Sequence, residues 1–272
     1  MLLAAGAVAM LQGSAPPADG FQDLGLDRNL AAGGLEVITG GSSQSPSVHS
    51  RQVLGFDDEL AREFAGQLGI RHLDLKPFHE RMRTRLPRYR PFIKDAARKN
   101  GFDWRLIAAQ AYRESHLDPL ARGAYDAQGL MQILPATARS YKLADPFDPV
   151  ANIKVGVQYL RWLYDLYEGV QEDDRLLMAL AAYNVGPGHV QDARRLAARL
   201  GLDPNRWDSL ATTLLLLRER RYYQDTEQGF CRGDITVAYV KHILVYYDIL
   251  KRHELDAMIA TAAAGANPTL VD

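Results

Sequence analysis

Apolar residues recur at steps of three and four in several segments of the chain, and this period predicts amphipathic helices. In residues 104–115 the apolar face consists of Trp104, Ile107, Ala108 and Ala111. Asp103 precedes this segment and can cap its first turn, so we expect a helix to begin there. Glu114 follows Ala111 by three residues and should therefore lie at the edge of the buried face.

Other segments carry helix signals of the same kind. Asp148 is a predicted cap, followed by Pro149 at the first helical position and by Gly169 as the stop. Residues 175–183 and 236–252 are expected to be helices, and residues 78–99 a basic helix interrupted by two prolines. These patterns predict a mainly α domain.

The first third of the chain reads differently. Residues 1–20 contain an apolar run followed by small residues, as in a secretory signal, but the first basic residue is Arg28. We expect either an export signal or an Ala-rich leader. The run is too short to remain as a membrane-spanning anchor.

Residues 34–76 predict a strand, a helix and a second strand, at 35–39, 59–68 and 70–75, with Asp57 as the cap of the helix. This unit resembles the start of a periplasmic solute-binding domain. One such unit cannot cover both faces of a sheet, so we expect a short α/β remnant without ligand-binding capacity.

Composition excludes several functions. The formal net charge of −1 gives no reason to expect nucleic acid binding. The single Cys231 cannot form an intramolecular disulfide, and we interpret it as a packed thiol. His116 has no second histidine three or four residues away, so no metal is expected.

Glu114 is the candidate catalytic residue. A carboxyl group partly withdrawn from water has a raised pKa, and a protonated carboxylic acid near neutral pH can donate a proton to a glycosidic oxygen. The alternative is a structural glutamate at the helix surface or in an ion pair with Arg113 or Arg122.

Two downstream segments add candidate binding residues. Gly129 permits a tight turn, and beside it Met131 and Gln132 combine an adaptable thioether with an amide, which suits an amphipathic sugar. Tyr183 and Asn184 stand where an apolar helix ends at a Gly- and Pro-rich stop. Core packing of Met131 and a purely local role of the helix end remain as alternatives.

Four motifs in this order resemble the lytic murein transglycosylases of the soluble-transglycosylase and goose-lysozyme superfamily, over about residues 78–252. They are Glu114-Ser115, Gly129-Leu130-Met131-Gln132, Ala181-Ala182-Tyr183-Asn184 and Ala238-Tyr239-Val240. The chain is most similar to the membrane-bound F type, as indicated by Trp104-Arg105-Leu106, Trp207 and the segment Gly229-Phe230-Cys231. The resemblance implies a lysozyme-like helical catalytic domain at residues 77–253, with a tail at 254–272.

The resemblance also implies an activity: cleavage of peptidoglycan between N-acetylmuramic acid and N-acetylglucosamine, with closure of a 1,6-anhydro ring. No second carboxylate accompanies the motifs, so Glu114 would act as acid and then as base, without a cofactor. Ser115 and Gln132 would bond sugar or Glu114, Tyr183 and Asn184 would orient the acetamido group, and Met131 and Tyr239 would line the cleft. Hydrolytic muramidase activity and non-catalytic binding of peptidoglycan are the alternatives.

We expect a monomer in the periplasm or cell envelope, with peripheral association at the outer membrane or with cell-wall machinery. The chain departs from the family pattern in two segments. Gly123 and Asp126 stand where many relatives have Ser and Gly, which puts a hydroxyl contact with the sugar in doubt. Ile235 stands where relatives often have Glu, and Asp234 beside it is a candidate substitute.

Overall fold

The computed structural model describes residues 53–70 and 75–265. Within these residues the secondary structure is helical, without a β-strand beyond isolated bridges. The helices are α2 (Val53–Gln67), α3 (Leu75–Thr84), α4 (Leu86–Lys99), α5 (Trp104–Ser115), η2 (Ala124–Asp126), α6 (Pro135–Ser140), α7 (Pro149–Asp165), α8 (Glu172–Val185), α9 (Pro187–Arg199), α10 (Trp207–Leu216), α11 (Arg220–Tyr223) and α12 (Gly233–Gly265). The prediction of a mainly α catalytic region is confirmed.

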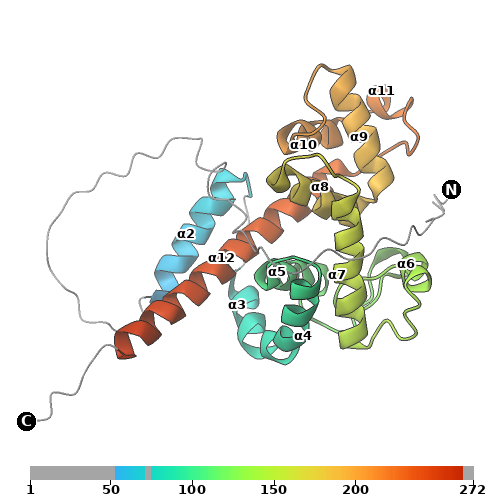
Figure 1. Cartoon of the computed structure of the whole chain (residues 1–272). Helices are drawn as coiled ribbons and strands as arrows, with labels where there is room; N and C mark the ends of the chain where they lie inside the picture. The colour runs from blue at the N-terminus through green and yellow to red at the C-terminus, as the bar shows by residue number, and fades with distance from the viewer. Residues whose placement is uncertain (1–52, 71–74, 266–272) are drawn as a thin grey trace, which may run out of the picture.

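Helix α12 is the axis of the fold. It runs diagonally through the molecule in Figure 1 and packs against α5, α8, α10 and, toward its C-terminal half, α2. On the other side of α5, helix α4 contacts both α5 and α7, and α7 in turn packs on α8. Helix α5 therefore lies between α12 and α4, which places Glu114 near the centre of the domain.

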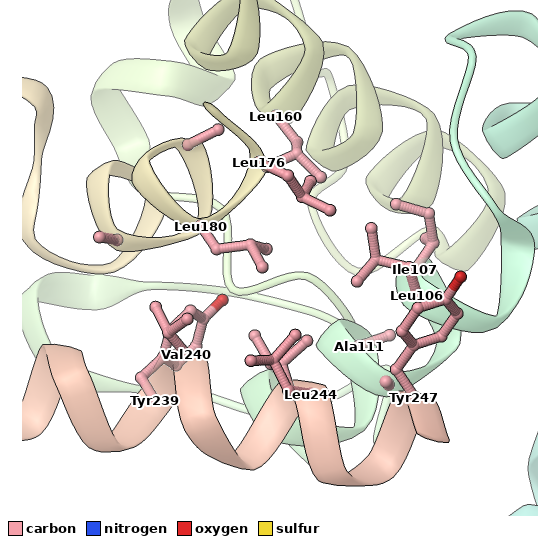
Figure 2. Packing of buried hydrophobic residues seen from close by; sticks show 14 of the residues in the cluster. Leu106, Ile107, Ala111, Leu160, Leu176, Leu180, Tyr239, Val240, Leu244 and Tyr247 are labelled. Carbon is pink, nitrogen blue, oxygen red and sulfur yellow. The ribbon is translucent and has the colours of Figure 1, made fainter. Parts of the chain in front are cut away.

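The core fills the space between α12 and the helices that surround it. Figure 2 shows side chains of α5, α7 and α8 meeting those of α12: Leu106, Ile107, Ala111, Leu160, Leu176, Leu180, Tyr239, Val240, Leu244 and Tyr247. Burial of a Leu or Ile side chain contributes about 1.5–3 kcal/mol. Removal of such area from water is what fixes α5 against α12.

The predicted helix caps are present. Asp103 accepts a hydrogen bond of 2.8 Å from the backbone N–H of Arg105 and begins α5. Asp148 accepts from Ala151 and begins α7, with Pro149 at its first position. Helix α7 ends at Asp165, before the predicted stop; Gly169, with φ of 87°, lies in the turn that follows.

Three boundary predictions need correction. Leu75, predicted as the end of a strand, begins α3, because Leu75 and Phe78 are three residues apart and both turn into the core. Only the first proline in residues 78–99 coincides with a break: Pro87 lies in the first turn of α4, whereas Pro91 lies inside that helix. The predicted tail at 254–272 is helical as far as Gly265, since Ala-rich sequence continues α12.

The structure describes only part of the segment to which the N-terminal predictions apply. The leader at 1–20 and the strand at 35–39 lie outside the described residues. The predicted helix at 59–68 corresponds to α2, which packs on α12 through the buried Ala61 and Ala65. Helix α2 is therefore docked on α12, whereas the predicted strand-helix-strand unit as a whole lies only in part within the described residues.

Candidate active site

Glu114 lies in the last turn of α5, next to its terminal residue Ser115. The residue keeps part of its surface exposed, but the protein around its carboxyl group withdraws that group from water. This burial raises the pKa of Glu114 from 4.5 to about 7, although a hydrogen bond from Tyr239 and the positive charge of Arg113 act in the opposite direction. The carboxyl group of Glu114 therefore titrates near neutral pH, where its protonated form can act as a general acid.

Tyr239 is the hydrogen-bond partner of the acid. Its hydroxyl donates to Oε1 of Glu114 at 2.5 Å. The Tyr239 side chain comes from α12 and is 2% exposed, so it lies beneath Glu114 in the core rather than forming an outer wall of the site. The structure places Tyr239 next to Glu114, and the hydrogen bond between them was not anticipated from the sequence.

Ion pairing does not account for Glu114. Neither of the two arginines proposed as partners forms an ion pair with it in the part of the chain that the structure describes. Arg122 approaches Asp126 at 3.6 Å, and Nε of Arg113 is buried without a hydrogen-bond partner. The hydrogen-bonded, partly neutral acid is therefore the better description of Glu114 than a structural salt bridge.

The segment between α5 and α6 is folded over the end of α5 by its own hydrogen bonds. Gly129 has φ of 80°, a left-handed conformation that favours glycine, and a Cβ there would lie 2.3 Å from the carbonyl oxygen of Pro146. Ser115 Oγ donates to the carbonyl oxygen of Leu130 at 2.8 Å and so ties the loop to α5. The loop is thereby held against the residue that follows the acid.

Gln132 closes the same loop. Its amide nitrogen donates to the carbonyl oxygens of Ala121 and Gly129. A Cβ on Gly123 would come within 2.1 Å of Oε1 of Gln132, so a side chain at this position requires the amide to move. Glycine at position 123 is thus matched to the observed position of Gln132.

Met131 faces inward. Its side chain is 0% exposed and lies against Gly156 of α7, as in the packing alternative and not as part of an open wall. Its backbone N–H donates to Oδ1 of Asn152 at 2.7 Å, and its carbonyl accepts from the Tyr183 hydroxyl at 2.8 Å. Met131 therefore contributes its backbone to the site.

Tyr183 and Asn184 occupy the last turn of α8, as predicted, before Gly186 ends the helix with φ of 91°. Burial, and then the nearby Glu114 carboxylate, raise the pKa of the Tyr183 hydroxyl well above its ordinary value, so it remains a neutral donor. Asn184 is exposed and accepts a hydrogen bond from Thr236 of α12 at 2.9 Å. The other six predicted site residues are buried or partly buried.

Two buried amides were missed by the sequence analysis. Asn152 of α7 binds the loop from below, with Nδ2 donating to the carbonyl oxygens of Gln128 and Pro146. Gln110 of α5 donates from Nε2 to the Tyr239 hydroxyl oxygen at 3.3 Å. Each is a polar residue beside the apolar face of a predicted helix, next to Ile153 and Ala111, and that local inconsistency is the signal that could have revealed them.

The remaining candidate groups lie elsewhere. Cys231 is buried, and burial raises the pKa of its thiol to about 11, in agreement with a packed, unreactive residue. Asp234 pairs with Arg218 at 3.4 Å. Among the described residues no group of three His, Cys, Asp or Glu side chains could hold a metal ion, and no helix is long and apolar enough to cross a membrane.

The sequence of this region is similar to sequences of known proteins. Residues 91–203 match the transglycosylase SLT domain. A membrane-bound lytic murein transglycosylase F of Desulfosudis oleivorans is 50% identical over 66% of this chain and 40% of its own length. A membrane-bound lytic murein transglycosylase F of Vibrio cholerae is 36% identical over 76% of this chain and 39% of its own length. The chain thus spans about two fifths of the length of these relatives.

Among solved structures, the soluble lytic transglycosylase SLT70 of Escherichia coli matches with a TM-score of 0.45 and 18% identity, covering 75% of this chain and 35% of that chain. The family assignment depends on the sequence matches, which include Glu114 and both downstream motifs within residues 91–203. Residues 91–203 therefore contain a transglycosylase SLT domain, and the chain is similar to the membrane-bound lytic murein transglycosylases F.

Proposed function

We propose that this protein is a lytic transglycosylase that cleaves the bond between N-acetylmuramic acid and N-acetylglucosamine in peptidoglycan. The observation that carries the proposal is the buried carboxyl group of Glu114, with a pKa of about 7, within the residues that match the transglycosylase SLT domain. Relatives named lytic murein transglycosylases support the substrate class.

In the proposed mechanism Glu114 acts twice. Its proton passes to the glycosidic oxygen, the bond from that oxygen to the anomeric carbon breaks, and the N-acetylglucosamine part leaves with a free hydroxyl while the acetamido oxygen of the substrate stabilises the anomeric carbon. The resulting carboxylate then accepts a proton from the C6 hydroxyl of the same sugar, and the C6 oxygen closes the 1,6-anhydro ring. A hydroxyl held within the substrate competes well with water, because effective molarities of oriented groups reach about 10⁵ M or more.

The other site residues would bind and orient the glycan. Tyr183 donates its one hydroxyl hydrogen to the carbonyl of Met131, so its oxygen is left to accept from the N–H of the acetamido group. The exposed amide of Asn184 suits a polar sugar substituent. Ser115 and Gln132 would contact the glycan and would also hold the loop between α5 and α6 in place. Met131 and Tyr239 would support this surface from inside, which replaces the wall role expected of them from the sequence.

The substrate requires a location outside the cytoplasm, so we propose that the protein works in the cell envelope as a monomer, with peptidoglycan strands as its partner. Peripheral association with the outer membrane or with cell-wall machinery belongs to the same proposal. The folded catalytic region is proposed to be residues 77–253.

Mass spectrometry of fragments released from purified sacculi tests the function. A lytic transglycosylase produces muropeptides that end in 1,6-anhydro-N-acetylmuramic acid. Reducing ends in their place would identify a hydrolytic muramidase, and retention on sacculi without release of fragments would identify a binding protein.

A further inference from the structure

Gln110 is a polar residue in an apolar interior. It lies on α5 four residues before Glu114, is 0% exposed, and forms one hydrogen bond, from Nε2 to the hydroxyl oxygen of Tyr239 at 3.3 Å. Its Oε1 is buried without a hydrogen-bond partner. An unpaired buried acceptor costs free energy, so a residue of the same length without an amide would pack at this position more favourably. Packing therefore gives no reason for this glutamine.

The hydrogen bonds around Tyr239 give a reason. We propose that Gln110 is a positioning residue that orients the Tyr239 hydroxyl so that it donates to Glu114; this role rests on the proposed function. The Nε2 group of Gln110 is a donor only, so the Tyr239 oxygen must accept from it, and the single O–H of Tyr239 is left to donate to Oε1 of Glu114.

This chain of two hydrogen bonds has a chemical consequence at the acid. Because Oε1 of Glu114 accepts from Tyr239, the acid proton resides on Oε2, the oxygen that remains for the glycosidic oxygen of the substrate. Donation from Gln110 also polarises the Tyr239 hydroxyl and makes it a stronger donor. Gln110 thereby adjusts both the orientation of the proton and the acidity of Glu114 without touching the substrate.

Three other features of the surroundings stay constant when Gln110 is changed. Arg113 on α5 lies over the Tyr239 ring at 5.7 Å and its charge favours the ionised form of Glu114. Tyr183 on α8 faces Glu114 but donates its hydroxyl proton to the carbonyl of Met131. The burial of the Glu114 carboxyl group is also retained, so a change in its titration can be assigned to the hydroxyl of Tyr239.

The test is a titration of Glu114 in the full chain, followed by NMR of its carboxyl carbon and assigned with Glu114→Gln. Gln110→Met keeps the length of the side chain and removes the amide. We expect the pKa of Glu114 to rise by about half a unit, because the freed Tyr239 hydroxyl can then accept from the protonated acid; Tyr239→Phe should raise it by about one unit. Adding Gln110→Met to Tyr239→Phe should cause no further shift.

Two further measurements separate positioning from packing. The rate of sacculus cleavage by Gln110→Met should decline with rising pH at a higher pH than in the wild type, in step with the shifted pKa, while the melting temperature stays equal or rises. Leu106→Met is the matched control, a volume-conserving change in the core of the same helix, and should leave the titration of Glu114 unchanged.

The titration also keeps the two proposals apart, because it needs no substrate. An unchanged or lowered pKa of Glu114 in Gln110→Met would overturn the positioning role. The same is true if Gln110→Met shifts the pKa of Glu114 equally in the wild type and in the Tyr239→Phe variant. If the wild type releases no fragments from sacculi, the proposed function fails, while the orientation of Tyr239 is still decided by the titration.

Discussion

Tyr239 and Glu114 are 125 residues apart in the chain, yet the Tyr239 hydroxyl donates to Oε1 of Glu114 at 2.5 Å. The contact exists because α5 packs directly on α12. Two opposing effects act on the carboxyl group: burial favours its neutral form and the hydrogen bond favours its charged form, and burial is the larger effect. Burial thus keeps the acid from being permanently ionised, and the hydrogen bond from Tyr239 limits the rise of its pKa to about 7.

The first prediction concerns pH and activity. Only the protonated form of Glu114 can donate to the glycosidic oxygen, so kcat/KM for release of soluble fragments should fall as pH rises through about 7. The measurement is a rate profile in a constant-ionic-strength buffer series with stability checked at each pH. A rate that stays flat across the neutral range would argue against Glu114 as the acid.

The second prediction concerns Tyr183. Tyr183→Phe removes the hydroxyl that donates to Met131 and that is proposed to orient the acetamido group. Turnover should fall about tenfold or more, whereas the free energy of unfolding should drop by only about 1 kcal/mol, the net value of one neutral hydrogen bond.

Tyr222→Phe on α11 is the matched control and should leave turnover unchanged. A large loss of stability in Tyr183→Phe, with normal specific activity of the folded fraction, would show that the hydroxyl serves the fold alone.

Much of this site was predictable because local signals agree with the tertiary structure. The three-residue step from Ala111 to Glu114 placed the acid at the edge of the core, and Asp103 fixed the start of α5. Gly129 and Gly186 correctly indicated a turn and a helix end, and both residues have the positive φ that glycine adopts readily. These features depend on neighbours in the sequence.

The misses depend on contacts between distant segments. Met131 could face the core or the ligand, and only the proximity of Gly156 on α7 decides for the core. The roles of Gln110 and Asn152 become visible only once α12 and the loop before α6 are in place. Leu75 was misread because a short apolar run has no period of its own, so strand and helix could not be distinguished.

The third prediction concerns Asn152. Its side chain is 0% exposed and pairs with the N–H of Met131 and the carbonyls of Gln128 and Pro146. Asn152→Ala leaves the N–H of Met131 and the carbonyl of Pro146 without these partners, while the carbonyl of Gln128 keeps its hydrogen bond from the N–H of Ile133. The free energy of unfolding should therefore drop by about 2 kcal/mol or more. Denaturant unfolding measures this drop.

Lys154→Ala, an exposed change on the same helix, should stay within about 0.5 kcal/mol of the wild type. If Asn152→Ala unfolds at the same denaturant concentration as this control, the three hydrogen bonds do not stabilise the loop.

The fourth prediction concerns α2. Ala65 is 1% exposed where α2 packs on α12, so Ala65→Asp introduces a charge into this contact and should release α2. The melting temperature should fall by several degrees, in the range expected for a loss of about 1–2 kcal/mol, while specific activity below the transition stays normal. Gln67→Asp on the exposed face of α2 is the control. Loss of activity in folded Ala65→Asp would mean that α2 contributes to catalysis and is more than a docked remnant.

The last prediction concerns Glu114 itself. Glu114→Gln keeps the size of the side chain and an acceptor for Tyr239 but cannot deliver a proton, so cleavage should fall at least about 10²-fold while binding to sacculi persists. Stability should respond in a characteristic way. The pKa of Glu114 is raised from 4.5 to about 7, so the folded state takes up a proton more readily than the unfolded state, and this contribution is full below about pH 4.5 and is lost as pH rises through about 7.

The corresponding change in the free energy of unfolding is about 3 kcal/mol. Glu114→Gln should not lose this stability between acidic and neutral pH, whereas the contributions of the histidines should be the same in both proteins. Chemical denaturation of both proteins across this pH range measures the difference directly. Glu227→Gln neutralises an exposed carboxylate and should alter neither activity nor the pH profile. Near-normal release of anhydromuropeptides by purified Glu114→Gln would refute the catalytic assignment, and parallel stability profiles would refute the raised pKa, because burial of the carboxyl group cannot favour its neutral form without linking folding to its protonation.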